Sequence, residues 1–327
     1  MPEFTMTIAG KAVKGGASFG VVNPATAKVF ATVPDCTRAQ LDEAMDAAAK
    51  AFPAWSADEP RRRKVLADCA AALQQRSEGM APLLTQEQGK PLHKAAEELM
   101  GASMWFQYTA GLELPVEVVQ DDGNARVEIR RRPLGVVAAI TPWNYPLLLA
   151  VWKIAPALLA GNTLVLKPSP FTPVTTLVLG EILRDVVPAG VVNVISGGDG
   201  LGAWMTTHPV PRKLSFTGSV ATGKKVAAAA APDLKRVTLE LGGNDPAILL
   251  PDVDPKTVAP KIFWGAFENC GQICSAIKRV YVHEKQQGAL VEELVALARS
   301  VKVGNGMEEG TQIGPINNEP QWKRVVV

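Results

Sequence analysis

The chain has 327 residues, of which 47% are hydrophobic and 20% charged, and 34 basic against 32 acidic side chains leave a net charge of +2. This composition is typical of a globular protein with room for two domains, and it argues against a disordered or fibrous chain. The near-balanced charge gives no electrostatic reason to expect nucleic acid or an anionic membrane as a partner.

Cysteine and histidine usage argues against disulfide or metal chemistry. Four cysteines are too few for a disulfide framework, and Cys270 and Cys274 have no second cysteine or histidine pair at ligand spacing. The longest apolar stretch, residues 145–166, is interrupted by lysine, proline and asparagine and is not expected to span a bilayer. The first residues lack the basic and apolar regions of a signal peptide, so we expect a cytoplasmic location.

The first hundred residues are expected to be helical. An alanine-rich helix should begin after Thr37, which can serve as its N-cap. Apolar residues at helical spacing predict helices over residues 39–52, 60–76, 79–89 and 92–111.

The hydrophobic period then changes from helical to alternating. Residues 116–119 and 125–130 alternate on either side of the turn sequence Asp-Asp-Gly-Asn at residues 121–124. This pattern predicts a β-hairpin.

Strands and helices alternate from Gly135 onwards. Residues 136–140 form a continuous apolar run, as in a strand buried on both faces. The alternation predicts a doubly wound parallel sheet with right-handed crossovers. The expected strands are residues 136–140, 163–166, 191–195, 213–216 and 237–241, and the expected helices are residues 146–160, 173–187, 202–208 and 222–231.

Polar and small residues follow three of these strands. They occupy residues 141–144, 167–170 and 217–219, which should meet at one edge of the sheet, where parallel sheets bind ligands. Residues 218–223 precede a helix, so their backbone N–H groups could hold a phosphate, although they lack the Gly-x-Gly-x-x-Gly fingerprint. Lys167 at the same edge favours anion binding over a simple helix cap.

A cysteine and a glutamate suggest covalent catalysis. Cys274 lies in Asn-Cys-Gly-Gln-Ile-Cys-Ser (residues 269–275), and Glu240 lies in Leu-Glu-Leu-Gly-Gly upstream of it. A thiolate attacks carbonyl groups well, and a carboxylate can activate water against the resulting thioester. Taken alone, a cysteine of this kind is more often inert core, and a glutamate such as Glu240 is more often a strand-end carboxylate paired with a basic residue.

Taken together, these segments resemble the NAD(P)-dependent aldehyde dehydrogenase superfamily from about Phe19 to the end of the chain. They occur in the order and at the spacings of that family. The matching segments are Thr-Pro-Trp-Asn-Tyr-Pro (residues 141–146), Lys-Pro-Ser-Pro (167–170), Phe-Thr-Gly-Ser (216–219), Leu-Glu-Leu-Gly-Gly-Asn (239–244) and Asn-Cys-Gly-Gln-Ile-Cys (269–274).

The resemblance implies oxidation of an aldehyde to a carboxylic acid with NAD or NADP. Cys274 would be the nucleophile, Asn144 and the Cys274 backbone N–H would stabilise the oxyanion, and Glu240 would activate water. Lys167 would belong to the catalytic residues and would also bind the adenosine ribose. The apolar neighbours of Glu240 in the sequence should raise the pKa of its carboxyl group. The remaining cofactor contacts would be Ile140, Thr141, Pro142, Trp143, Ser169, Phe216, Gly218, Ser219 and Leu241.

The expected fold is α/β, with a doubly wound parallel-sheet (Rossmann-like) cofactor domain and part of an α/β catalytic domain. Residues 1–114 and 133–241 would bind NAD(P), residues 115–132 would form an oligomerisation hairpin, and residues 242–327 would begin the catalytic domain. Family members continue for well over a hundred residues, so the resemblance implies a truncated chain. The full-length form is expected to be a homo-oligomer.

Two further expectations concern specificity. Pro170 stands where family members often carry a glutamate that holds the NAD ribose, which predicts tolerance of NADP as well as NAD. Trp105, Phe106 and Trp152 suggest apolar walls for a medium-sized aliphatic or aromatic aldehyde, although aromatic residues in helices are more often part of the core.

Two other functions remain open at this point. One is a fragment that only binds nucleotide or assembles with another chain. The other is thiol chemistry with a different acceptor, as a thiol esterase or a coenzyme A-acylating enzyme, although Glu240 argues against the acylating version.

Overall fold

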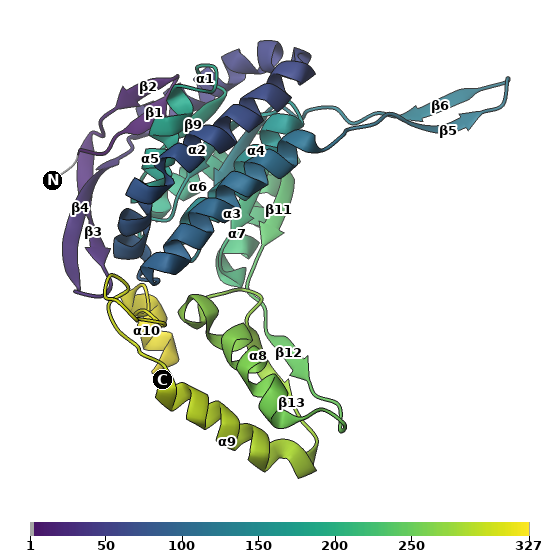
Figure 1. Cartoon of the computed structure of the whole chain (residues 1–327). Helices are drawn as coiled ribbons and strands as arrows, with labels where there is room; N and C mark the ends of the chain where they lie inside the picture. The colour runs from purple at the N-terminus through teal and green to yellow at the C-terminus, as the bar shows by residue number, and fades with distance from the viewer. Residues whose placement is uncertain (1–2, 327) are drawn as a thin grey trace.

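The computed structural model describes residues 3–326, and its main body is a seven-stranded sheet covered by helices on both faces (Figure 1). The strand order is β11-β10-β7-β8-β9-β1-β2, in which the five strands from β11 to β9 pair in parallel. The parallel strands are β7 (Val136–Ile140), β8 (Thr163–Lys167), β9 (Val192–Val194), β10 (Lys213–Thr217) and β11 (Arg236–Glu240). The predicted doubly wound α/β fold is therefore confirmed.

The strand order contains the topological switch that creates a ligand crevice. The chain proceeds from β7 outwards to β8 and β9, and then returns to place β10 on the other side of β7. Loops leaving β7 and β10 consequently diverge to opposite faces of the sheet and leave a crevice at their carboxyl ends.

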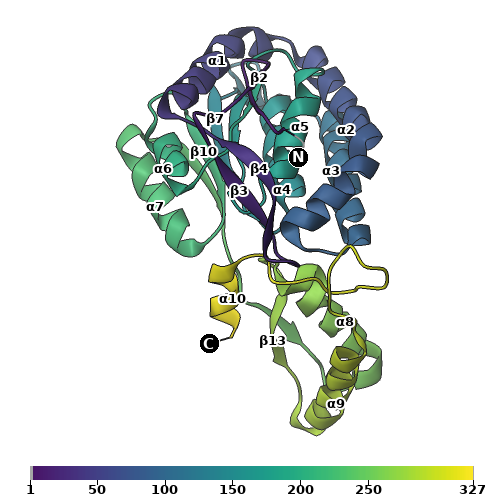
Figure 2. The ribbon, with the colours of Figure 1, turned by 90° about the vertical axis from the view of Figure 1, so that its left-hand side faces the viewer.

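Helices of the two faces come from different parts of the chain. One face carries α2, α3, α4 and α5, while α1, α6 and α7 lie on the other (Figure 2). The helices of the main body are α1 (Arg38–Ala57), α2 (Glu59–Gln88), α3 (Leu92–Gly111), α4 (Pro146–Leu159), α5 (Val174–Arg184), α6 (Asp199–Thr207), α7 (Val220–Ala230) and the 3₁₀ turn η1 (Ala231–Asp233).

The local signals for the long helices are confirmed in part. Thr37 caps α1 in a reciprocal capping box with Gln40, as the N-cap expectation requires. Residues 59–88 form one continuous helix rather than the two expected segments, because residues on both sides of Gly79, such as Leu73 and Leu84, pack into the same core. The helix then ends at Gly89, whose φ of 100° favours glycine.

The expectation that the first hundred residues are helical is wrong for the first 35. This segment forms β1 (Met6–Ile8), β2 (Lys11–Val13), β3 (Ala17–Asn23) and β4 (Lys28–Asp35). Strand β1 extends the main sheet antiparallel to β9, and β3 pairs with β4 in a separate ribbon. Pairing with β9, which lies far along the chain, makes β1 a sheet strand, and no local pattern reports such a partner.

The predicted hairpin is confirmed as an arm that projects from the body (Figure 1). It consists of β5 (Glu117–Asp121) and β6 (Arg126–Ile129), and every residue of β5 is exposed. Its role in assembly stays a prediction.

The chain after β11 forms a smaller unit below the main body (Figures 1 and 2). A small apolar core of Ala259, Ile262 and Leu290 holds it together. Its elements are β12 (Asp245–Ile248), α8 (Pro255–Phe267), the 3₁₀ turn η2 (Glu268–Gly271), β13 (Ile277–Tyr281), α9 (Glu284–Ser300) and α10 (Glu319–Val325). Within residues 3–326, no helix has the length and apolar character needed to cross a bilayer.

Candidate active site

A cavity of about 550 Å³ lies at the carboxyl edge of the sheet and extends to the smaller unit. It brings together residues that the sequence placed far apart. The predicted site residues that line it are Pro142, Trp143, Asn144, Gly218, Ser219, Glu240, Leu241 and Cys274. Ile140, Lys167 and Phe216 do not line the cavity but lie at the same ends of β7, β8 and β10. Ile140 pairs with Lys167 of β8 on one side and with Phe216 of β10 on the other.

The edge next to α7 has the form of an anion site. Ser219 caps α7, its Oγ accepting from the backbone N–H of Thr222 at 3.1 Å, and the helix N-terminus faces the cavity edge. Glycine at residue 218 gives the Phe216 ring its place, because a Cβ there would lie 2.5 Å from that ring and force it to move.

Glu240 ends β11 beside this turn. Its backbone carbonyl accepts from the N–H of Gly218 at 3.0 Å, which ties the two strand ends together. The side chain is exposed, so the expected enclosure by apolar neighbours is wrong, because β11 is the edge strand of the sheet.

Lys167 supplies a buried cation at the end of β8. Only 3% of its surface is exposed, and burial lowers the pKa of its ammonium to about 8. The Nζ atom donates to the carbonyl oxygen of Pro168 at 3.1 Å, and no other acceptor is assigned to it within residues 3–326. Nearby, the Oγ1 atom of Thr141 is buried without a partner among the same residues. Unused buried donors of this kind fit a ligand rich in hydroxyl and phosphate oxygens.

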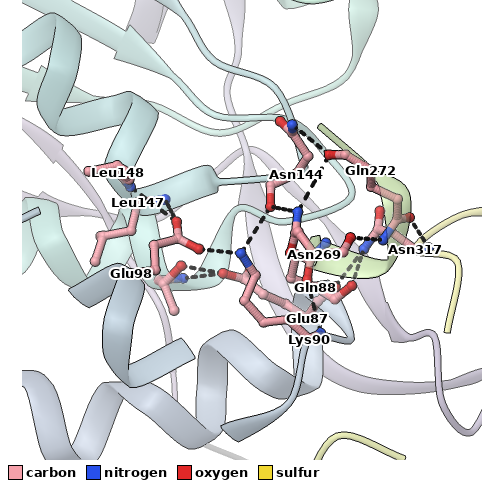
Figure 3. A network of polar contacts seen from close by, with 11 residues as sticks. Glu87, Gln88, Lys90, Glu98, Asn144, Leu147, Leu148, Asn269, Gln272 and Asn317 are labelled. Atoms are coloured by element: carbon pink, nitrogen blue, oxygen red, sulfur yellow. Dashed lines mark hydrogen bonds and ion pairs between the residues drawn. The ribbon is translucent and has the colours of Figure 1, made fainter. Parts of the chain in front are cut away.

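The side chain of Asn144 points towards Gln272, in the segment of residues 269–274 that leads to Cys274 (Figure 3). Its Nδ2 atom donates to the carbonyl oxygen of Gln272 at 2.8 Å. One amide N–H is thereby fixed, and the second remains for an oxygen atom in the cavity.

An unusual backbone turn precedes Cys274. Asn269, Cys270 and Gly271 have φ values of 50°, 62° and 74°, so three consecutive residues adopt the left-handed conformation. Side-chain contacts hold it: the Nδ2 atom of Asn269 donates to the carbonyl oxygen of Asn144 at 2.9 Å, and the Sγ atom of Cys270 accepts from the backbone N–H of Gly314 at 3.1 Å. Burial raises the pKa of the Cys270 thiol, which agrees with a packing role.

Lys278 is a cavity residue that the sequence analysis missed. Its Nζ atom donates to the carbonyl oxygens of Ile273, Cys274 and Ala276 at 3.0, 2.9 and 3.1 Å. The ammonium group thus binds the backbone on both sides of the nucleophile candidate. No signal in the sequence could have found it, because an exposed lysine in a strand is ordinary.

Lys153 is a second missed residue. It lies in α4, lines the cavity and donates from Nζ to Ser215 Oγ at 3.2 Å. Burial lowers the pKa of its ammonium to about 8, against an opposing effect of the nearby Glu240 carboxylate. Its signal was present in the sequence, since a lysine inside the longest apolar stretch requires a partner.

Two tryptophans form an apolar wall of the cavity. The ring centroids of Trp105 and Trp152 lie 5.2 Å apart, and both residues line the cavity. Phe106 is fully buried in the main core, so its place in the wall is wrong and the core alternative holds for it, because helical geometry turns neighbouring residues of α3 to different sides.

Comparison with known proteins decides the family. Residues 12–326 match the sequence profile described as "Aldehyde dehydrogenase family". The chain belongs to this family.

Among residues 3–326, no group of three or more histidine, cysteine, aspartate or glutamate side chains could hold a metal ion.

Named relatives agree with this membership. The chain is 40% identical over 321 residues to aminoaldehyde dehydrogenase 1, peroxisomal, of Pisum sativum, and the match covers 93% of this chain and 63% of that protein. The NAD+ complex of an aldehyde dehydrogenase from Bacillus cereus superposes with a TM-score of 0.96 at 35% identity, covering 99% of this chain and 68% of that one. An NADP-dependent enzyme from E. coli matches with a TM-score of 0.95 at 35% identity, covering 99% and 69%. This chain therefore spans about two thirds of the length of its relatives.

Proposed function

We propose that this protein oxidises aldehydes to carboxylic acids with NAD or NADP, through a thioester on Cys274. The observation that carries the proposal is the cavity in which Cys274, Asn144 and Glu240 meet at the carboxyl edge of the sheet. The three side chains come from three separate segments, and their convergence supplies a nucleophile, an oxyanion donor and a base.

In the first step, the Cys274 thiolate attacks the carbonyl carbon of the aldehyde, and the carbonyl oxygen takes up negative charge. The free amide N–H of Asn144 and the backbone N–H of Cys274 donate to that oxygen. Both donors are neutral, so they hold the developing charge without titrating. Removing one such donor typically costs about 10²–10³ in turnover.

The cofactor proposal depends on the α7 N-terminus and Lys167. The adduct of Cys274 and the aldehyde becomes a thioester when a hydride leaves its carbon atom, and bound NAD(P)+ would supply the acceptor for that hydride. The backbone N–H groups after Ser219 would hold the pyrophosphate, and the unused donors of Lys167 would bind ribose hydroxyls. Pro170 carries no carboxylate to repel a 2′-phosphate, so both cofactors should serve. The solved relatives named above include one complex with NAD+ and one enzyme called NADP dependent.

Glu240 would complete the reaction as the general base. Its exposed side chain can reach water, which would take the place of the thiolate at the acyl carbon and release the acid. Lys153 adds a positive charge on the same side of the cavity.

The substrate would be a medium-sized aliphatic or aromatic aldehyde. Trp105 and Trp152 provide the apolar wall of the cavity.

Three further parts of the proposal concern organisation. Residues 1–114 and 133–241 would form the cofactor domain, residues 242–327 would belong to the catalytic domain, and the arm at 115–132 would join subunits of a homo-oligomer. Nucleic acid is not proposed as a partner. A cytoplasmic location stays a prediction, because the pea relative is named for the peroxisome.

Ester cleavage is a second candidate activity. Cys274 is exposed and lines the same cavity as the proposed oxyanion donor Asn144, and acyl transfer from an activated ester needs no cofactor.

The test is reduction of NAD and NADP by the purified protein with a panel of aldehydes, alongside Cys274→Ala and Glu240→Gln variants. We expect turnover with both cofactors, loss of all turnover in Cys274→Ala, and an initial burst without steady turnover in Glu240→Gln. Cofactor binding without turnover on any aldehyde would refute aldehyde oxidation and leave nucleotide binding and ester cleavage, which an assay with an activated ester separates.

A further inference from the structure

A buried ion pair lies behind the proposed oxyanion site, outside the cavity. The Nζ atom of Lys90 and the Oε2 atom of Glu98 are 2.5 Å apart, with 1% and 0% of their side chains exposed. Lys90 belongs to the short α2–α3 connection and Glu98 to α3. Burying two charges is costly unless each makes further hydrogen bonds, so their other contacts are informative.

Glu98 holds the start of α4. Its Oε1 atom accepts from the backbone N–H groups of Leu147 and Leu148 at 3.0 and 3.1 Å. The first turn of α4 has no capping side chain of its own, since Tyr145 stands at the N-cap position. Glu98 therefore satisfies N–H groups that an ordinary N-cap residue would satisfy.

Lys90 holds the residue that carries the oxyanion donor. Its Nζ atom donates to the backbone carbonyl oxygen of Asn144 at 3.1 Å (Figure 3). The same Nζ atom lies 3.9 Å from the ring centroid of Tyr145. The same carbonyl oxygen accepts from Asn269 Nδ2 at 2.9 Å. Two donors thus fix the Asn144 peptide group.

The ion pair binds the chain at two points that directly follow the Asn144 side chain. Lys90 fixes the carbonyl of residue 144, and Glu98 fixes the N–H groups of residues 147 and 148, so the end of the β7–α4 loop and the first turn of α4 are held together. Neither Lys90 nor Glu98 lines the cavity. We propose that Lys90 and Glu98 are positioning residues that orient the Asn144 amide towards the oxyanion of the reacting aldehyde. This inference rests on the function proposed above.

The main variant is Lys90→Met/Glu98→Gln. Lys90→Met alone would leave a buried unpaired carboxylate and endanger folding, whereas the double variant has no charge and keeps an amide oxygen for Leu147 and Leu148. Lys235→Met is the matched control, because Lys235 is an equally buried lysine whose Nζ holds two backbone carbonyls, those of Thr206 and His208, away from the cavity.

Two kinds of Cys274 reaction, with and without an oxyanion, separate positioning from misfolding. Aldehyde oxidation and cleavage of p-nitrophenyl acetate both pass through an oxyanion, whereas alkylation of Cys274 by iodoacetamide forms none. We expect kcat of both oxyanion reactions to fall on the order of tenfold, less than the cost of removing a donor outright. Alkylation rate and NAD affinity should be unchanged. Lys235→Met should leave all four quantities at their wild-type values.

A double-mutant cycle completes the test. In an Asn144→Ala background the Lys90→Met/Glu98→Gln change should lower kcat no further, because the amide that it orients is gone. The proposal is overturned if the effect persists in that background, if kcat is unchanged, or if alkylation falls along with kcat.

The failure of the proposed function would be visible separately. If the wild-type protein oxidises no aldehyde with either cofactor, that function fails, and ester cleavage then measures the positioning effect. If ester cleavage is absent too, crystal structures of the protein and the double variant decide. A displaced Asn144 amide, no longer bonded to the Gln272 carbonyl, supports the inference, and an unmoved amide refutes it.

Discussion

Asn269 provides the sharpest test of how the left-handed turn before Cys274 is stabilised. Two separate effects favour asparagine there: its φ of 50°, which asparagine tolerates better than alanine, and its Nδ2 bond to the Asn144 carbonyl at 2.9 Å. Replacement by alanine removes both, whereas replacement by glycine removes the bond but relieves the backbone.

The magnitudes follow from the contacts. The Asn144 carbonyl keeps Lys90 as a donor after the substitution, so no acceptor is left unsatisfied and the lost bond should cost about 1 kcal/mol. The left-handed conformation should add about 1–2 kcal/mol for alanine. Glycine avoids that penalty but loses about 0.5–1 kcal/mol through the freedom of the unfolded chain. Asn269→Ala should therefore destabilise the protein by about 2–3 kcal/mol, and Asn269→Gly by roughly 1 kcal/mol less.

The assay is urea unfolding of the three proteins, followed by fluorescence and compared at the transition midpoints. Turnover should fall in both variants, because each leaves the Asn144 carbonyl with one donor instead of two. A glycine variant as unstable as the alanine variant, or less stable, would refute the assignment of strain to residue 269.

Three further predictions address the cofactor site, the buried lysine and the nucleophile. Pro170→Glu should lower kcat/KM for NADP far more than for NAD, because the carboxylate would repel the 2′-phosphate; equal losses with both cofactors would contradict the placement of the ribose. Lys153 has its pKa lowered from 10.5 to about 8, so the unfolded chain binds more protons between these values and stability should rise with pH across that window. Urea midpoints measured from pH 8 to pH 10 should rise less steeply in Lys153→Met than in wild type. Lys278→Met should slow alkylation of Cys274 and lower kcat, with partial recovery in Lys278→Arg; unaltered alkylation kinetics would mean that the bonds to the backbone carbonyls do not shape the nucleophile.

Local patterns were sufficient for much of the architecture. Thr37 and Gln40 form the cap at which α1 begins, and residues 92–111 have the helical spacing that α3 shows. The apolar run at residues 136–140 correctly indicated a strand buried between helices. These features depend on neighbours within a few positions in the chain, so the sequence records them directly.

Strand partners and side-chain networks were beyond reach of the same reasoning. Strand β1 is in the sheet because Thr7 pairs with Val194, and Asn144 reaches Gln272 across 128 positions of the chain. The exposure of Glu240 likewise depends on β11 being an edge strand, which only the strand order decides.

The sequence by itself therefore determined the fold class, the family resemblance and the residue types available for chemistry, because motifs and periodicities are local. Only the tertiary structure decided that Lys278 holds the carbonyl groups around Cys274 and that Lys90 and Glu98 hold Asn144 from behind. Contacts between distant segments follow from how helices and strands pack, and a lysine or glutamate looks the same in a sequence whether it is solvated or buried in such a network.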